Sequence, residues 1–307
     1  MFIRQFIWIL LLGISFSLPG QKILVEGQVV DMETYTPLPY ATLQIFNQGT
    51  GTIADKEGKF SILIENEQHL SDSIEFSYLG YSKLTIPISS ILNEQGTVIA
   101  LEVSSYELSE VSVFPQSYRI KRLGIKKKKP EREQYANVFN ANKGNYIGNT
   151  MGVAGRIKAV SFYMADVGFP HAPFRIRVYE MDMINRSPGK DLLNENVVVS
   201  ASGPGWFTVD MSKYNIPFPL DGAFVMMEWI NSGKEFYFIK ELKTTNQNGE
   251  VFTKKRQFYG QTLGSVLRQP GMITWGRGLG QPWIPYEINY RGYLNVMINA
   301  DVAFPVD

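Results

Sequence analysis

Hydrophobic and polar residues alternate in short runs along the first third of the chain, beginning near residue 23. The odd-numbered residues from Ile23 to Val29 recur at the two-residue period of a half-buried β-strand. The same period predicts further strands at residues 41–46, 60–64, 74–78, 98–103 and 111–114. Short strands at this spacing, about seven in ninety residues, predict a β-sandwich.

Two segments that interrupt this pattern contain residues typical of turns and strand crossings. Pro37 and Pro39 have no backbone donor for a sheet and bias the residues before them toward extended geometry, so residues 31–39 are expected to cross between strands. In the run Asp55-Lys-Glu-Gly58, the Asp55 carboxylate is able to bond its own backbone and Gly58 tolerates a positive φ. A hairpin turn is therefore expected at this position.

These strings, taken together, resemble the carboxypeptidase-regulatory-like (transthyretin-like) domain that secreted and outer-membrane proteins of Bacteroidota often carry at their N-termini. The resemblance covers residues 23–113 and rests on the order of PLPYA, the DKEGKF turn, FSYLGY and LSEVSV. It implies a seven-stranded, non-catalytic β-sandwich and a place in the cell envelope. A TonB-dependent transporter, a common owner of this domain, needs a plug and a large barrel, for which the remaining sequence is too short.

From Gln134 onward the alternation continues without a sustained helical period. Strands are expected at residues 157–164, 174–180, 197–201, 206–211, 223–230, 236–240 and 294–300. About 170 residues of evenly spaced antiparallel strands predict a jelly-roll-like β-sandwich. The order of VSFYM, FRIRVYEMD, SPGKDLL, GWFTVDMSKYNI and GAFVMMEW is similar to the jelly-roll domains of carbohydrate-binding modules and lectins. The expected fold class is all-β throughout.

The first twenty residues have the charge and length of a secretory signal peptide. Arg4 precedes an apolar run from Phe6 that is shorter than the roughly 20 residues of a membrane span. Cleavage is expected after Ser17 or Gly20, and an uncleaved anchor is the alternative. The chain contains no cysteine, which excludes disulfides and a lipid anchor on an N-terminal Cys. Export to the periplasm, the outer membrane or the exterior is expected.

The expected domain boundaries are 1–20 for the signal peptide, 21–115 for the first sandwich, 116–135 for a basic linker and 136–307 for the second sandwich. Eight basic residues crowd the linker, namely Arg119, Lys121, Arg122, Lys126, Lys127, Lys128, Lys129 and Arg132. A run of this composition is typical of a solvated segment, so the two sandwiches are expected to fold independently. Peripheral contact of this linker with an anionic membrane surface is the functional alternative. Nucleic acid is not an expected partner, because export and the lack of a matching fold signature oppose it.

The sequence gives little support for a catalytic site. His69 and His171 are the only histidines, each in an expected loop, and neither has a zinc-spaced partner. Glu180-Met-Asp182 has the first two acids of a jelly-roll glucanase strand, but Asn185 stands where the acid/base carboxylate would be needed. No enzyme activity, cofactor or metal is expected. Calcium at Asp182, Asp191 or Asp301 has no supporting spacing.

One region has the composition of a binding site. Residues 273–293 combine glycine and proline with large aromatic residues. Sugar stacking is expected on Trp275, Trp283 and Tyr286. Arg277, Glu287 and Arg291 are the expected hydrogen-bonding residues, with Asn289 beside them. The alternative is that the aromatic side chains fold back and cap the core.

Two functions are therefore open. The first is a non-catalytic, exported binding protein for glycan or another surface polymer. The second is a structural or assembly component of an outer-membrane complex, which binds only protein through exposed strand edges or the basic linker. Exposure of the three aromatic side chains along a groove would favour glycan, and their burial would favour protein.

Overall fold

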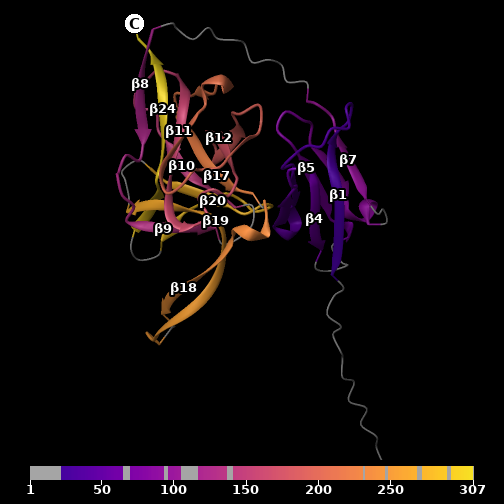
Figure 1. The fold of residues 1–307 in the computed structure, drawn as a ribbon. Coiled ribbons are helices and arrows are strands. Elements are labelled where there is room, and N and C mark those ends of the chain that lie inside the picture. The colour runs from indigo at the N-terminus through magenta and orange to yellow at the C-terminus, as the bar shows by residue number, and fades with distance from the viewer. Residues whose placement is uncertain are drawn as a thin grey trace, which may run out of the picture.

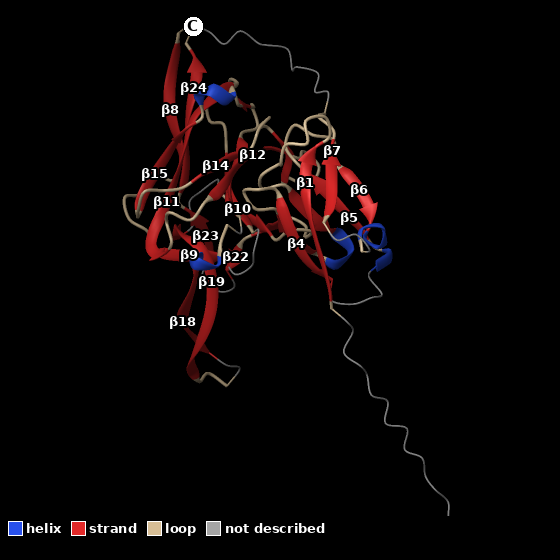
Figure 2. Cartoon of the chain, turned by 45° about the vertical axis from the view of Figure 1, so that its right-hand side comes forward, coloured by secondary structure: helices blue, strands red, loops and turns tan. Residues whose placement is uncertain are grey.

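The computed structural model describes residues 22–64, 70–92, 96–104, 117–136, 141–230, 232–245, 248–267, 272–288 and 292–306. These residues form strands and short 3-10 turns without an α-helix, so the expected all-β class is confirmed (Figures 1 and 2). None of the described segments is a helix with the length and apolar character needed to cross a membrane. The expected signal peptide and the expected strand at 111–114 lie outside the described residues.

The first sandwich consists of two small sheets. Their orders are β4-β1-β7 and β3-β2-β5-β6. The strands are β1 (Ile23–Asp31), β2 (Thr42–Ile45), β3 (Thr50–Ile53), β4 (Lys59–Ile64), β5 (Ser73–Ser77), β6 (Leu84–Pro87) and β7 (Thr97–Leu101). Alternate side chains such as Val29, Leu43 and Phe76 meet between the sheets and form a core of their own. The expected seven-stranded sandwich is thus present.

The turn between β3 and β4 has the chemistry expected from its sequence. The backbone N–H groups of Glu57 and Lys59 donate to Asp55 Oδ1 at 2.9 and 2.8 Å. Gly58 adopts φ +71°, and a Cβ at this position would lie 2.7 Å from the Val29 carbonyl oxygen. A side chain is therefore excluded both by the left-handed backbone and by the neighbouring strand.

The second sandwich has two larger sheets. The seven-stranded sheet has the order β13-β12-β17-β10-β20-β21, with β14 paired to β12. Its strands are β10 (Asn142–Ile147), β12 (Phe174–Met181), β13 (Pro188–Asp191), β14 (Val197–Val199), β17 (Ala223–Trp229), β20 (Thr274–Arg277) and β21 (Ile284–Pro285).

The ten-stranded sheet has the order β22-β23-β19-β11-β24-β8, with four further strands paired to β11 or β19. Its strands are β8 (Tyr118–Gly124), β9 (Arg132–Ala136), β11 (Gly155–Gly168), β15 (Gly205–Asp210), β16 (Pro217–Phe218), β18 (Tyr237–Thr245), β19 (Val251–Leu267), β22 (Glu287–Ile288), β23 (Gly292–Val296) and β24 (Ile298–Pro305). Phe174 and Trp229 from the first of these sheets share one core with Phe162 and Leu263 from the second. The molecule is a two-sheet sandwich here, and the jelly-roll class stays a prediction.

The segment expected to be a basic linker belongs to this second sandwich. β8 pairs antiparallel with β24 from Tyr118 to Gly124, and β9 pairs antiparallel with β19. Leu123 and Ala136 are buried in the core, while most of the basic side chains point outward. The linker prediction is wrong at these strands, because long-range pairing supplies the apolar neighbours that the segment lacks by itself. The exposed run Lys126–Lys129 is the turn between them.

Trypsin is expected to cut this exposed lysine turn first and to leave the two fragments associated. The cut breaks the chain between β8 and β9, but β8 remains paired with β24 of the same sheet, and Arg122 forms an ion pair with Asp301 at 2.6 Å. A denaturing gel should show two fragments, while size-exclusion chromatography should show one peak at the intact position. Replacing the four lysines with glutamine should remove the cut. Separate elution of the fragments would instead support the independent domains expected from sequence.

The two sandwiches contact each other directly. Ile53 of the first sandwich packs in a small buried cluster with Ile230 and Leu279 of the second. The backbone N–H of Gly280 donates to Gln44 Oε1 at 3.1 Å. The expectation of two independently folding sandwiches, which rested on composition, did not anticipate these contacts between them.

Candidate functional site

The outer face of the seven-stranded sheet carries a second aromatic layer. Alternate residues of β17 point to opposite faces, so Val225 and Met227 enter the core while Phe224 and Met226 point away from it. Phe224, Met226 and Tyr179 are buried there. Half-buried side chains surround them. We call this set the outer aromatic cluster; its members are Tyr146, Tyr179, Met181, Phe224, Met226, Trp275 and Trp283.

Two of the expected site residues, Trp275 and Trp283, meet in this cluster. The Trp275 ring stands edge-on to Phe224, with centroids 6.2 Å apart. The Trp283 ring stands edge-on to Tyr179 at 5.5 Å. The guanidinium carbon of Arg277 lies 4.1 Å from the centroid of the Trp283 ring, a cation–π contact. The structure thus brings Trp275, Trp283 and Arg277 together, with both indoles partly exposed.

Tyr286 lies on the other side of the sheet. Its ring is 4.1 Å from Lys143 Nζ, and Lys143 pairs across the strands with Met227, which faces the core. Lys143 donates to Gln134 Oε1 at 3.2 Å, and burial lowers the pKa of Lys143 to about 8. The expectation of one row of three aromatic side chains is therefore corrected to a pair, with Tyr286 separate from it.

The remaining expected site residues are not placed by the structure. Glu287 belongs to β22, where its backbone pairs with Tyr293, and its side chain is outside the described part. Arg291 and Asn289 lie outside the described residues altogether. Their roles stay predictions.

A buried ionic network lies on the same outer face, next to the first sandwich. Arg175 Nε donates to Glu228 Oε2 at 2.6 Å, and Arg177 Nε donates to the same oxygen at 3.3 Å. Arg177 also donates to Asp191 at 3.0 Å. Burial alone would raise the pKa of Glu228, but the two guanidinium groups outweigh it and hold that pKa at about 2. Glu228 is thus ionised over the whole physiological range of pH.

Arg175 also links the two sandwiches. Its Nη1 donates to the Tyr40 carbonyl at 2.9 Å, and its Nη2 donates to Thr42 Oγ1 at 3.1 Å. The residue is fully buried, with a relative exposure of 0%. The strand alternation that predicted β12 does not predict this burial. The sequence did contain a signal for this burial, because Arg175, Arg177 and Glu228 stand inside strongly apolar strings, where charged residues require partners.

The residues considered for catalysis or metal binding have separate structural contacts. His171 is exposed and stands edge-on to Phe169 at 5.8 Å, while His69 is outside the described residues. Asp182 accepts the backbone N–H of Ile184 at 2.8 Å in a turn. Asp191 pairs with Arg177 and Asp301 with Arg122. Across the described segments, no three His, Asp or Glu side chains are close enough together to hold a metal ion.

Comparison with protein families finds a match for the first sandwich. Residues 25–113 match the CarboxypepD_reg-like domain family, which is a regulatory, non-catalytic class, and the resemblance expected from the sequence is confirmed for this domain. The second sandwich lies beyond that match, and no curated protein matches the chain.

Among solved structures, the chain aligns with BcpA, the major pilin subunit of Bacillus cereus, at 12% identity and a TM-score of 0.18. This alignment covers 93% of the chain and 96% of the pilin subunit. This TM-score is too low to show that the two proteins share a fold.

Proposed function

We propose that the protein is an exported, non-catalytic binding protein of the cell envelope that recognises a glycan on its outer aromatic cluster. The observation that carries the proposal is the partly exposed pair Trp275 and Trp283 with Arg277 against the latter ring. Indole rings present flat apolar faces that suit the CH faces of sugars, and a guanidinium donates to hydroxyl groups. The buried Phe224 and Tyr179 beneath them hold the rings in place.

The test is retention of the whole chain on insoluble polysaccharides, comparing wild type with Trp283→Ala. We expect retention to fall about tenfold or more, because a stacked aromatic residue at the centre of a site contributes strongly to binding. Thermal stability should fall only modestly, since Trp283 is half-exposed. A loss of about 3–5 kcal/mol would place Trp283 in the core instead.

Trp206→Ala is the matched control. Trp206 is also half-exposed, but it lies on β15 of the other sheet, where it packs edge-on to Tyr163 at 5.6 Å. Its loss should leave polysaccharide retention unchanged. A wild-type protein that retains none of the polysaccharides, or equal losses in the two variants, would contradict glycan recognition at this cluster.

The second candidate is a structural or assembly component that binds only protein. The observation in its favour is the hairpin of β18 and β19, which leaves the sandwich and exposes strand edges (Figure 2). Exposed edges accept an added strand from a partner. Absence of glycan retention in the wild type would favour this function over the first.

A further inference from the structure

A long hairpin extends from the second sandwich. β18 pairs antiparallel with the first part of β19, from Tyr237 opposite Tyr259 to Thr245 opposite Val251. Residues 251–257 are all exposed, whereas β19 is buried from Phe258 to Val266, where it enters the sheet. We call residues 237–245 and 248–257 the arm. Figure 1 shows it extending away from both sandwiches.

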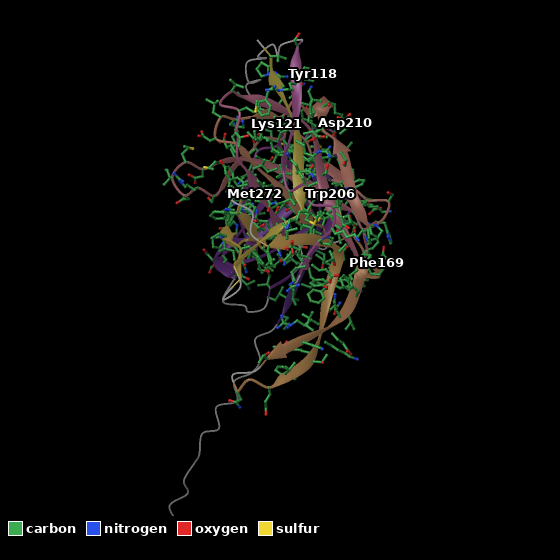
Figure 3. All side chains as sticks on the ribbon, turned by 90° about the vertical axis from the view of Figure 1, so that its left-hand side faces the viewer. Tyr118, Lys121, Phe169, Trp206, Asp210 and Met272 are labelled. Atoms are coloured by element: carbon green, nitrogen blue, oxygen red, sulfur yellow. The ribbon has the colours of Figure 1, made fainter. Side chains whose placement is uncertain are left out.

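The root of the arm is firmly packed. The register of β19 against β9 shifts between Tyr259 and Leu263, and Gly260 within this bulge adopts φ +67°, where the strand leaves the sheet. Phe238 of the arm stands edge-on to Phe169 at 6.2 Å. Figure 3 labels Phe169 beside the base of the arm. Lys240 forms an ion pair with Glu133 of β9 at 2.6 Å. The direction of the arm is therefore set by the fold.

The arm is cationic. It carries five basic residues, Lys240, Lys243, Lys254, Lys255 and Arg256, against two acidic residues, Glu241 and Glu250. The whole chain has a formal net charge of only +1. The arm thus holds a local excess of positive charge that the rest of the chain offsets.

One face of the arm concentrates this charge. Arg256 stands directly opposite Lys240, and Lys254 stands opposite Leu242. Like charges opposite each other on a sheet destabilise it, unless an anion lies between or near them. At the root of the arm, the Glu133 carboxylate neutralises the charge of Lys240. Within the described part of the chain, no ion pair involves Lys254 or Arg256.

The outer end of the arm is apolar and exposed. Phe252 is 45% exposed and Val251 is 67% exposed. Phe252 shares the cationic face, because it pairs with Thr244 in the same register as Lys254 with Leu242. A surface with basic side chains behind an exposed aromatic residue is complementary to an anionic bilayer, where cations meet headgroups and aromatic rings enter the interface.

We propose that the arm docks the protein on an anionic lipid bilayer, with Lys254 and Arg256 against the lipid phosphate groups and Phe252 in the headgroup layer. This interaction is separate from glycan recognition, because the outer aromatic cluster lies on the other sheet. It gives the protein a second attachment, so that it would hold a polymer ligand near a membrane surface.

Co-sedimentation of the whole chain with lipid vesicles tests this proposal. The vesicles are phosphatidylcholine alone and a mixture of phosphatidylcholine with phosphatidylglycerol. Binding is expected only to the mixture and should weaken as salt screens the charges. The double variant Lys254→Gln/Arg256→Gln should lower the partition coefficient about 30-fold. Phe252→Ser should lower it about tenfold through lost apolar contact.

The matched control is Lys128→Gln/Lys129→Gln, which removes the same charge from the exposed turn between β8 and β9. This variant should bind vesicles as the wild type does, and Trp283→Ala should do so too, which separates the arm from the glycan site. The proposal is overturned if the wild type binds neither vesicle or binds both equally. It is also overturned if the turn variant loses binding and the arm variant does not, or if the wild type is retained by acidic alginate but not by the anionic vesicles.

Discussion

Replacing Arg175 with alanine is expected to lower the free energy of unfolding by about 3–5 kcal/mol, the usual effect of removing one partner from a buried ion pair. Arg175 has no exposed surface, and its loss leaves the buried Glu228 carboxylate with one ion-pair partner, Arg177. It also leaves the Tyr40 carbonyl and the Thr42 hydroxyl without this donor, on the first sandwich. Both the second sandwich and the joint between the two should weaken.

Urea unfolding followed by tryptophan fluorescence measures this effect. Arg122→Ala is the matched control, because Arg122 also donates two hydrogen bonds to a carboxylate, Asp301, at 2.6 Å each. The side chain of Arg122 is 51% exposed, however, so its loss should change stability by about 1 kcal/mol or less. Similar costs for the two substitutions would show that burial of Arg175 has no energetic consequence.

Glu228→Gln is expected to cost a similar amount, about 3–5 kcal/mol at neutral pH, because two buried guanidinium groups then lose their shared carboxylate. Asp191 remains beside Arg177, but Arg175 keeps only neutral partners. The exposed pair of Glu241 and Lys255, 3.6 Å apart, supplies the control, and Glu241→Gln should leave stability nearly unchanged.

The cost of Glu228→Gln should depend on pH with a defined sign. The pKa of Glu228 is about 2 in the folded chain, below the ordinary glutamate value of 4.5. A lowered carboxyl pKa contributes stability that is present above the unfolded pKa and disappears as the pH falls toward the folded pKa. The difference in unfolding free energy between wild type and Glu228→Gln should therefore shrink between about pH 4.5 and pH 2. A difference that stays constant over this window would exclude an ionised Glu228 as its source.

Strands in which hydrophobic and polar residue types alternate were predictable from the sequence, and several others were not. The patterns at 157–164 and 174–180 found β11 and β12, because their alternation is visible in residue types. β10 escaped prediction because Lys143 and Asn145 are polar. Asn145 becomes a core residue only because its amide donates to the Val296 carbonyl at 2.6 Å, a partner far along the chain.

β19 was missed for a different reason. It is the longest described strand, at 17 residues, but residues 253–257 are polar on both faces and its buried second part contains two glycines. Neither part has a clear two-residue period. Pairing with β18, β9 and β11 makes it a strand, and these neighbours are distant or equally irregular in sequence.

The candidate site was predictable as a region and only partly as a set of residues. The aromatic composition of 273–293 pointed to Trp275 and Trp283, which do lie together. Tyr286 belongs to the same aromatic region, but its contact with Lys143 places its ring on the core side of the sheet. Which face a ring occupies depends on strand register, which residue types in an irregular loop do not reveal.

The sequence by itself determined the local chemistry of this protein: the all-β class, the turn at Asp55–Gly58 and the resemblance of the first sandwich to the CarboxypepD_reg-like domain family. These features depend on neighbouring residues, whose φ preferences and side-chain alternation act over a few positions. Only the tertiary structure decided that the basic segment supplies β8 and β9, and that Arg175 is buried at the joint between the sandwiches. Both outcomes depend on partners far away in sequence, such as Asp301 and Tyr40, because a charge is buried only where the fold brings its counterparts within hydrogen-bond distance.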